Sequence, residues 1–419
     1  GYYELWAQDA LADARLAQEE MGEYFMPFNS NSNYYIQRAD DRILSIREDF
    51  DEYYGGVHGM YGTIGYVFDT KTGKQLTLGD VLLETDSISA LLAEKLEAKY
   101  AEELEGFHDS ILETMKGYAL EDYKWTLDYE GITFYFDPYE LASYAAGLLT
   151  ITLPYGEYPE LFPAELTEQP KNGYIKGVPL WNTMELDLNP ADEKTDTVSV
   201  IAASIGEYGE KQIEITRNEA HYVDEESFGY RFASFLMYQE GGYYLVVKGV
   251  AENEYPTLYV YDLNGETIRR IGCYEGTGFP YPDMETEDEQ YGLHEVIHDP
   301  AQLTLSTVVY ALGTMDGRRE YHFEKGILAA EESYYTLPDY VPPLISKVEL
   351  EVPLQGEEGT AVLPAGTAYY FKATDNETYV DMDLEDGRTV RLELGEGEWC
   401  YTINGMSEYD VFEELFYAG

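Results

Sequence analysis

The second half of the chain alternates short strand-forming runs with tight turns, and this pattern limits it to a β-rich fold. Asn264-Gly265 and Asp316-Gly317 each lie between two such runs. Both dipeptides favour the positive backbone angles of a two-residue β-hairpin turn. We therefore predict an all-β middle domain over residues 165–343, built either as a sandwich or as a partial propeller-like array.

Residues 1–164 mix helix signals with strand signals, which predicts an α+β domain. Apolar residues recur on one helical face through 5–21 and 88–104. Asp80 is a candidate helix cap, because its side chain can accept a hydrogen bond from an unpaired backbone N–H group. Strands are predicted at 64–68, 132–136 and 149–153.

The last part of the chain, residues 344–419, predicts a small β-barrel with a closing helix over 409–416. Its turn at 363–367 resembles those of the SH3-like barrels that are appended to bacterial cell-wall proteins. The strands that we expect here are 348–352, 363–367, 369–372, 379–383 and 389–394.

The charge of the chain excludes some partners. It carries 81 acidic and 26 basic residues, for a formal net charge of −55. Nucleic acid and anionic membranes are excluded as partners, because both require clustered Lys and Arg. A cationic partner would be attracted. The acidic side chains either keep an exported protein soluble or serve to bind a particular basic partner.

Tyrosine is unusually frequent, with 42 residues. Its flat ring and hydroxyl group suit carbohydrate stacking and protein contacts. Tyrosine is also enriched in β-sheets, so most of these residues are expected to be ordinary strand residues.

Three turns in the first domain carry a resemblance to a known family. They are the turn at 54–58, the Thr72-Gly73-Lys74 turn, and the Asp137-Pro138 corner. In this order they resemble the extracytoplasmic domain of RsiV-type lysozyme-sensing anti-sigma factors and the non-catalytic region of PdaC-type peptidoglycan deacetylases. The resemblance covers residues 40–162.

The resemblance implies an extracytoplasmic protein, secreted or anchored at the cell surface, whose leader is absent from this sequence. It also implies a non-catalytic binding module for a cationic protein such as lysozyme, or for wall glycan. No run of apolar residues is long enough to cross a membrane. The candidate binding residues surround two of the turns and are Tyr53, Tyr54, His58, Tyr61, Asp137 and Tyr139. His58 either orients its turn through a backbone carbonyl group or contacts a partner.

One segment offers an enzymatic alternative. His294-Glu295-Val296-Ile297-His298 matches the H-E-x-x-H pattern of zinc peptidases, in which two histidines bind the metal and the glutamate is the general base. The segment is too short for the long helix that such a site needs, so an incidental match is favoured over a zinc hydrolase. We therefore predict no cofactor and no catalytic residue.

Two further patterns have structural readings. Asp381, Asp383 and Glu385 alternate as in a calcium loop, but Gly387 falls one position late, so a hairpin is the preferred reading. The only cysteines, Cys273 and Cys400, argue against a disulfide framework, and two unpaired thiols are expected.

Overall fold

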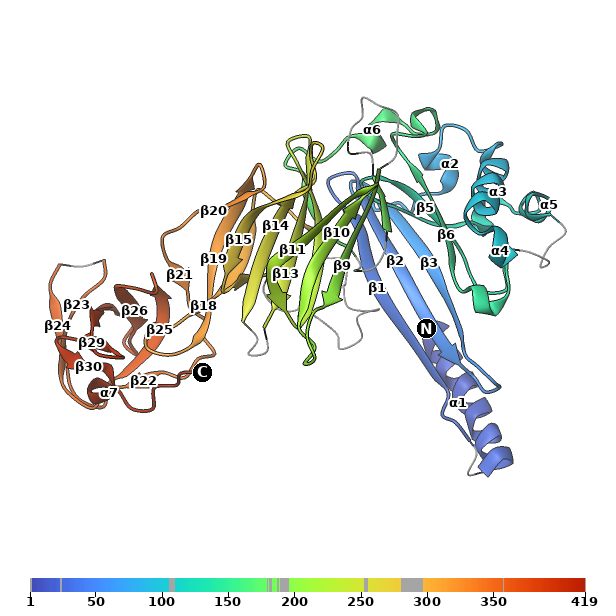
Figure 1. Ribbon diagram of the computed structural model, residues 1–419. Coiled ribbons are helices and arrows are strands. Elements are labelled where there is room, and N and C mark those ends of the chain that lie inside the picture. Colours follow the sequence, from blue (N-terminus) through green and yellow to red (C-terminus); the bar gives the residue numbers. More distant parts are fainter. Residues whose placement is uncertain are drawn as a thin grey trace. The chain divides into compact units, whose positions relative to one another are not determined.

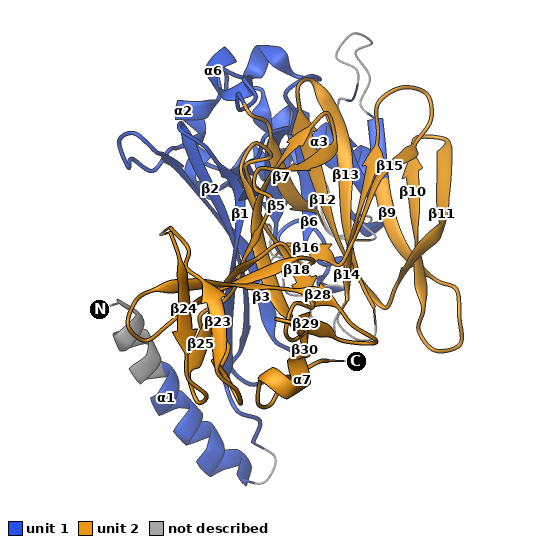
Figure 2. Cartoon of the chain, turned by 90° about the vertical axis from the view of Figure 1, so that its left-hand side faces the viewer, with its two compact units in different colours: residues 1–171, 183–198, 294–297 blue, residues 172–182, 199–293, 298–419 orange. Residues whose placement is uncertain are grey.

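The computed structural model describes residues 2–22, 25–104, 110–178, 180, 183–186, 188, 196–251, 255–279, 297–356 and 358–418. The chain divides into two compact units (Figure 2). Unit 1 comprises residues 1–171, 183–198 and 294–297, and unit 2 comprises residues 172–182, 199–293 and 298–419. The predicted fold class is confirmed, because a helix-containing N-terminal region is followed by many strands in several sheets. The predicted domain boundaries after residues 164 and 343 stay predictions.

Unit 1 contains two antiparallel three-stranded sheets and several helices (Figure 1). The first sheet has the order β1 (Asn29–Ala39), β2 (Ile43–Tyr53) and β3 (Met60–Asp69). The second has the order β4 (Lys124–Leu127), β5 (Gly131–Phe136) and β6 (Leu149–Pro154). The helices are α1 (Tyr2–Met21), α2 (Leu78–Val81), α3 (Ile88–Lys99), α4 (Ala101–Leu104), α5 (Ile111–Met115) and α6 (Ala164–Thr167). Strand β8 (Thr183–Leu186) also belongs to this unit, as do the 3₁₀-helices at Leu120–Asp122, Tyr144–Ala146 and Pro159–Leu161.

The core of unit 1 lies between α3 and the second sheet. Leu92 and Leu96 on α3 are fully buried with Phe134 on β5 in one apolar cluster. Helix α2 begins at a capping box in which the Asp80 carboxylate accepts hydrogen bonds from Thr77 N (2.9 Å) and Thr77 Oγ1 (2.7 Å). The cap residue is thus Thr77, and Asp80 is the third helical residue. This corrects the sequence prediction, which assigned the cap to Asp80.

A β-bulge in β1 places an arginine inside unit 1. Ile36 pairs with Ile46 and Arg38 pairs with Ser45, so that Gln37 is the extra residue between two paired positions. The Arg38 side chain is 1% exposed, and its Nε donates to Asp40 Oδ2 at 2.7 Å. The buried charge is therefore paired and hydrogen-bonded, as burial requires.

Strand β3 of the first sheet has two glycines where other segments of unit 1 come close. A Cβ atom at Gly65 would lie 1.8 Å from Trp125 O, and one at Gly62 would lie 2.5 Å from Asp137 Oδ2. Glycine at these two positions of β3 lets β4 and the corner after β5 approach the β2–β3 hairpin.

Unit 2 is built from antiparallel sheets. One has the order β15 (Arg269–Glu275), β14 (Pro256–Asp262), β13 (Gly242–Val250), β12 (Arg231–Gln239) and β7 (Tyr174–Val178). A second contains β11 (Ala220–Gly229), β10 (Lys211–Arg217) and β9 (Asp196–Ser204), the last of which begins in unit 1. A third runs through β16 (Thr277–Gly278), β18 (Leu303–Val309), β19 (Met315–Glu324), β21 (Tyr335–Thr336), β25 (Ala368–Thr374), β26 (Tyr379–Asp383) and β27 (Thr389–Glu393).

The middle of unit 2 packs its sheets face to face, which agrees with the sandwich alternative. Phe235 on β12 and Val260 on β14 share an apolar cluster with Leu305 on β18 and Phe323 on β19. Strand β17 (Ile297–His298), which begins in unit 1, pairs at the β7 edge of the first of these sheets. The shorter strands of unit 2 are β20 (Ile327–Ala330), β22 (Leu344–Ile345), β23 (Leu350–Pro353), β24 (Thr360–Leu363), β28 (Gly395–Glu396), β29 (Tyr401–Ile403) and β30 (Met406–Ser407).

One of the two predicted hairpin turns is confirmed and the other is wrong. Asn264-Gly265 lies between β14 and β15, and Gly265 has a φ of 81°. Gly317 instead lies within β19, where an added Cβ would meet Tyr335 Cβ at 2.8 Å. The turn before β19 uses Leu312 (φ 61°) and Gly313 (φ 140°). Gly317 thus provides close strand approach rather than a turn.

The C-terminal strands are near their predicted positions, but those in the described parts of residues 344–419 do not close into a barrel. Strands β25 to β27 instead extend the third sheet of unit 2. The closing helix α7 spans only Glu408–Val411, because Phe412 is extended, with φ −117° and ψ 153°.

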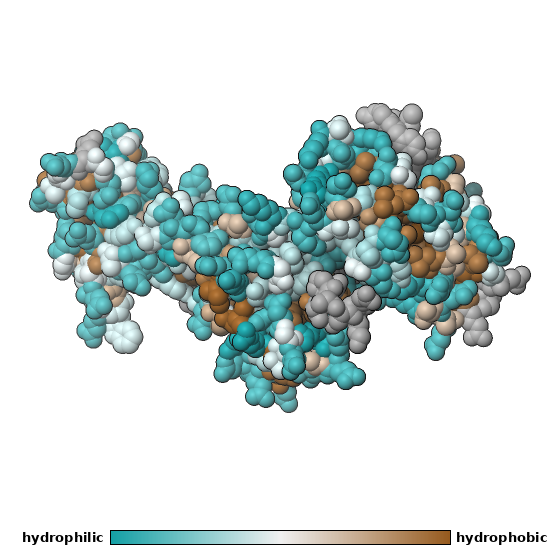
Figure 3. Space-filling view, turned by 90° about the horizontal axis from the view of Figure 1, so that it is seen from above, coloured by the Kyte–Doolittle hydropathy of each residue, from teal (hydrophilic) through white to brown (hydrophobic). Residues whose placement is uncertain are grey.

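Hydrophilic residues dominate the face drawn in Figure 3, and hydrophobic residues form smaller groups on it. Within the residues that the structure describes, no helix is both long and apolar enough to span a membrane.

Candidate functional site

The tip of the β2–β3 hairpin holds most of the candidate binding residues. The chain reverses at Gly55 (φ 94°) and Gly56 (φ 98°), angles that are costly for residues with a Cβ atom. The Tyr53 hydroxyl group donates to Gly56 O at 3.0 Å and holds the turn against the end of β2. The glycine pair therefore sets the position of His58, which follows it.

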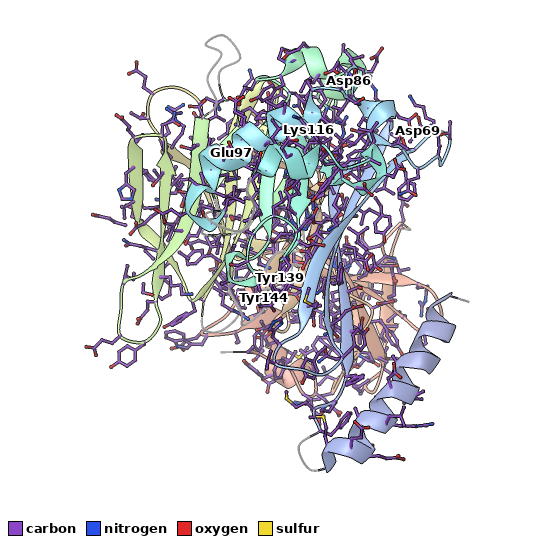
Figure 4. All side chains as sticks on the ribbon, turned by 90° about the vertical axis from the view of Figure 1, so that its right-hand side faces the viewer. Asp69, Asp86, Glu97, Lys116, Tyr139 and Tyr144 are labelled. Atoms are coloured by element: carbon purple, nitrogen blue, oxygen red, sulfur yellow. The ribbon has the colours of Figure 1, made fainter. Side chains whose placement is uncertain are left out.

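Four aromatic side chains gather beside this turn, and we call His58, Tyr61, Tyr139 and Tyr144 the tip cluster. The His58 ring stacks on Tyr144 with centroids 4.1 Å apart. Tyr61 meets Tyr144 edge-on at 5.6 Å, and Tyr139 lies 5.5 Å from Tyr144. Figure 4 shows Tyr139 and Tyr144 next to each other. Tyr144 is thus the centre of the cluster.

Hydrogen bonds to the backbone orient the cluster. His58 Nδ1 lies 2.8 Å from Gly59 O, and the Tyr144 hydroxyl group donates to the same oxygen at 3.0 Å. Because a carbonyl oxygen only accepts, Nδ1 carries the hydrogen, which leaves Nε2 to accept from the Tyr139 hydroxyl group at 3.4 Å. His58 thus orients its turn through a carbonyl group, as one of the two predicted roles requires.

An ion network below the cluster fixes the corner that carries Tyr139. Lys124 Nζ donates to Asp137 Oδ2 at 2.7 Å and to Glu140 Oε2 at 2.8 Å. Asp137 Oδ1 also accepts from Thr63 N at 2.9 Å, so this carboxylate links the corner to β3. Asp137 is therefore a structural link, with its side chain 17% exposed.

The two partners of this ion pair respond differently to burial. Burial raises the pKa of Asp137 above its ordinary value in spite of the Lys124 charge. Burial also works to lower the pKa of Lys124, but the hydrogen bonds to Asp137 and Glu140 raise it overall. Lys124 lies within hydrogen-bonding distance of both carboxylates, so the three groups hold the corner together as a network.

A cavity of about 540 Å³ opens beside the tip cluster. Tyr53, Tyr61 and Tyr144 line it together with the carboxylates Asp51 and Glu52. Aromatic faces next to carboxylates attract a cation, because the ring face and the carboxylate both carry negative potential. The site is therefore chemically suited to a lysine or arginine side chain, or to another cationic group.

The structure separates the six candidate residues into four places. Tyr53 and Tyr61 line the cavity, and His58 and Tyr139 belong to the tip cluster. Asp137 lies in the ion network. Tyr54 packs edge-on against Phe28 at 5.7 Å and does not line the cavity. Their role in binding stays a prediction.

Tyr144 was not predicted from the sequence. It lies in the same block as Asp137 and Tyr139, but nothing in its local pattern distinguishes it from the other tyrosines. Gly147, three residues later, approaches the Tyr61 hydroxyl oxygen, from which an added Cβ would lie 3.4 Å, but a lone glycine in the sequence does not indicate this contact.

The predicted zinc alternative is only partly described. His294 and Glu295 lie outside the described residues. His298 stacks on Phe279 with centroids 4.7 Å apart, and burial lowers its pKa to about 4. Among the described residues, no group of three or more His, Cys, Asp or Glu side chains is arranged to hold a metal ion. The zinc hydrolase stays a prediction without a supporting observation.

The calcium-like segment adopts the hairpin that was preferred. Asp381 and Asp383 lie on β26, where Asp381 pairs with Arg391 and Asp383 pairs with Lys372, both on neighbouring strands.

Cys273 and Cys400 are both free thiols.

Part of unit 1 matches a known family model. Residues 80–156 match a family described as a protein of unknown function, DUF3298. The matched segment contains Tyr139 and Tyr144, whereas His58 and Tyr61 precede it.

Two solved structures of DUF3298 proteins are similar to parts of the chain. One, from Bacteroides fragilis, is 24% identical, with a TM-score of 0.30, over 39% of this chain and 67% of that one. The other, from Pseudomonas aeruginosa, is 20% identical, with a TM-score of 0.26, over 34% of this chain and 66% of that one. The matches thus span about two thirds of these proteins. No curated protein matches the chain.

Proposed function

We propose that this chain is an exported bacterial cell-envelope protein that binds a cationic protein through the tip cluster and the cavity beside it. The observation that carries the proposal is the placement of three tyrosines and two carboxylates around one cavity. Such a surface can hold basic side chains by cation–π contacts and ion pairs together.

Two sequence features support this choice. The net charge of −55 would steer a basic protein toward the chain. The resemblance to RsiV-type and PdaC-type extracytoplasmic domains supports both the location outside the cytoplasm and a lysozyme-like partner. Wall glycan is the competing ligand, because tyrosine faces also stack on sugars.

The first test is calorimetry with lysozyme at low and at physiological salt, with a second small basic protein of similar charge as the control. We expect lysozyme to bind at both salt concentrations, and the control protein only at low salt. Screening weakens general charge attraction but affects close, partly buried contacts less. If both proteins bind only at low salt, the net charge explains the binding and the proposed site fails.

Variants then locate the contact. Tyr144→Ala removes the centre of the tip cluster, and we expect lysozyme affinity to fall about tenfold or more, as for a central aromatic contact residue. Tyr208→Ala is the matched control, because Tyr208 is 82% exposed and lies outside the site. Equal effects of the two variants would contradict the assignment. Binding of soluble wall glycan in place of lysozyme would redirect the proposal to a sugar ligand.

A further inference from the structure

A second aromatic site lies in unit 2, at a turn where one residue has an unfavourable backbone angle. Gly397 N donates to Cys400 O at 2.9 Å and closes the turn between β28 and β29. Trp399 occupies this turn with a φ of 66° and is 93% exposed. The left-handed region is unfavourable for a residue with a Cβ atom, and an exposed tryptophan gains no compensating stability from burial. Folding therefore gives no reason for tryptophan at this position.

The turn borders a cavity of about 450 Å³ that is lined mainly by aromatic rings. This volume falls in the range of small-molecule sites. The aromatic residues of its lining are Tyr310, Trp399, Tyr401, Tyr409 and Tyr417.

Carboxylates supply the charge of this cavity, and among the described residues no basic side chain lines it. Glu408 is 1% exposed and accepts hydrogen bonds from Tyr401 N at 3.0 Å and from the Tyr417 hydroxyl group at 2.7 Å. Its carboxylate is therefore held in place in the wall of the cavity, and Glu396 adds a second one. The nearby Lys347 donates through Nζ to Tyr409 O at 2.9 Å and is not part of the lining.

A lining of aromatic rings and carboxylates, with no basic side chain among the described residues, favours a cationic ligand over a neutral one. A cation gains from both the ring faces and the carboxylates, and tryptophan is the best ring for such a contact. A neutral sugar would gain only stacking and hydrogen bonds, and it would displace water from the carboxylates without neutralising their charge.

We propose that this cavity binds a small organic cation with an alkylated ammonium group, held between Trp399 and the tyrosine rings. The site lies outside the tip cluster, so the proposal is independent of the function proposed above.

The test uses the full chain and choline as the probe, with Trp fluorescence and calorimetry as readouts. The uncharged carbon analogue 3,3-dimethylbutan-1-ol has the same shape, and N-acetylglucosamine represents a neutral sugar. We expect choline to bind at least about tenfold more tightly than either neutral probe. Equal or tighter binding of a neutral probe would overturn the assignment of a cationic ligand, and no binding of choline would overturn the site.

The variant Trp399→Gly removes the proposed ligand contact without disturbing the fold. Glycine adopts a φ of 66° without strain, so this variant should unfold at the same temperature as the wild type or at a higher one. We expect it to lose choline binding about tenfold or more, whereas Trp399→Phe retains most of it. General attraction of choline to an acidic chain would survive in Trp399→Gly, and that result would refute the proposal.

Discussion

Gly65→Ala tests whether β4 lies directly against the hairpin that carries the tip cluster. The new Cβ atom would lie 1.8 Å from Trp125 O, which must move by roughly 1.6 Å to reach an ordinary contact of 3.4 Å. Such a movement would also stretch the buried hydrogen bond from Leu127 N to Ser45 Oγ, now 3.0 Å. Crowding of a packed interior costs about 1–3 kcal/mol, and a buried N–H group without a partner costs about the same. We therefore expect a loss of about 4 kcal/mol in the free energy of unfolding.

Urea unfolding followed by circular dichroism measures this loss as a shift of the transition midpoint. Gly79→Ala is the matched control, because Gly79 lies in α2 and its nearest neighbouring atom would be Thr77 Oγ1 at 3.9 Å. Alanine in a helix should leave stability unchanged or raise it. A Gly65→Ala protein that loses less than about 1 kcal/mol would refute the close approach of the two strands.

Three further outcomes are expected. The hydrogen bonds from Lys74 and Thr77 lower the pKa of Asp80 to about 2. Their contribution to the free energy of unfolding is therefore complete above the ordinary pKa of an aspartate and is lost as the pH falls toward 2. Asp80→Asn should remove this part of the acid dependence of stability, as measured by urea unfolding at several pH values. Asp137→Ala should cost about 1–3 kcal/mol more in thermal unfolding than Asp137→Asn, because the asparagine oxygen can still accept from the Thr63 N–H group; equal losses would contradict that bond. Burial raises the thiol pKa of Cys273, so iodoacetamide should alkylate it at neutral pH more slowly than free cysteine in a mass-spectrometric time course.

The sequence predicts those features that depend on a few adjacent residues. Asn264-Gly265 forms the expected turn because its angles are set locally, and Gly55-Gly56 does the same at the hairpin tip. Asp316-Gly317 has a similar pattern but lies inside β19, because Gly317 is required for contact with Tyr335, a residue distant in the sequence. Local patterns do not show such contacts.

The same limit applies to the candidate site. Local sequence predicts the turn at 54–58 and the Asp137-Pro138 corner. The structure joins them through the hydrogen bond from Thr63 N to Asp137 Oδ1 and the contact of Tyr139 with His58. Tyr144 was missed, because its position at the centre of the cluster depends on how the β4–β6 sheet meets the hairpin. The predicted barrel failed for a related reason. Whether strands close or extend a neighbouring sheet depends on edge pairing, such as that of Tyr335 with Thr374.

The bulge in β1 lets two successive side chains enter the interior of unit 1. Partners across a sheet lie on the same face, so Ile36, opposite Ile46, already faces away from Arg38, opposite Ser45. Gln37 is the extra residue, and it is buried beside Arg38 whereas Ile36 is 40% exposed. Deleting Gln37 would therefore restore a continuous ladder and keep Tyr35 buried and Ile36 exposed. A deletion elsewhere in β1 would instead exchange the two faces of the strand, so a change of length should be tolerated at the bulge better than at its neighbours.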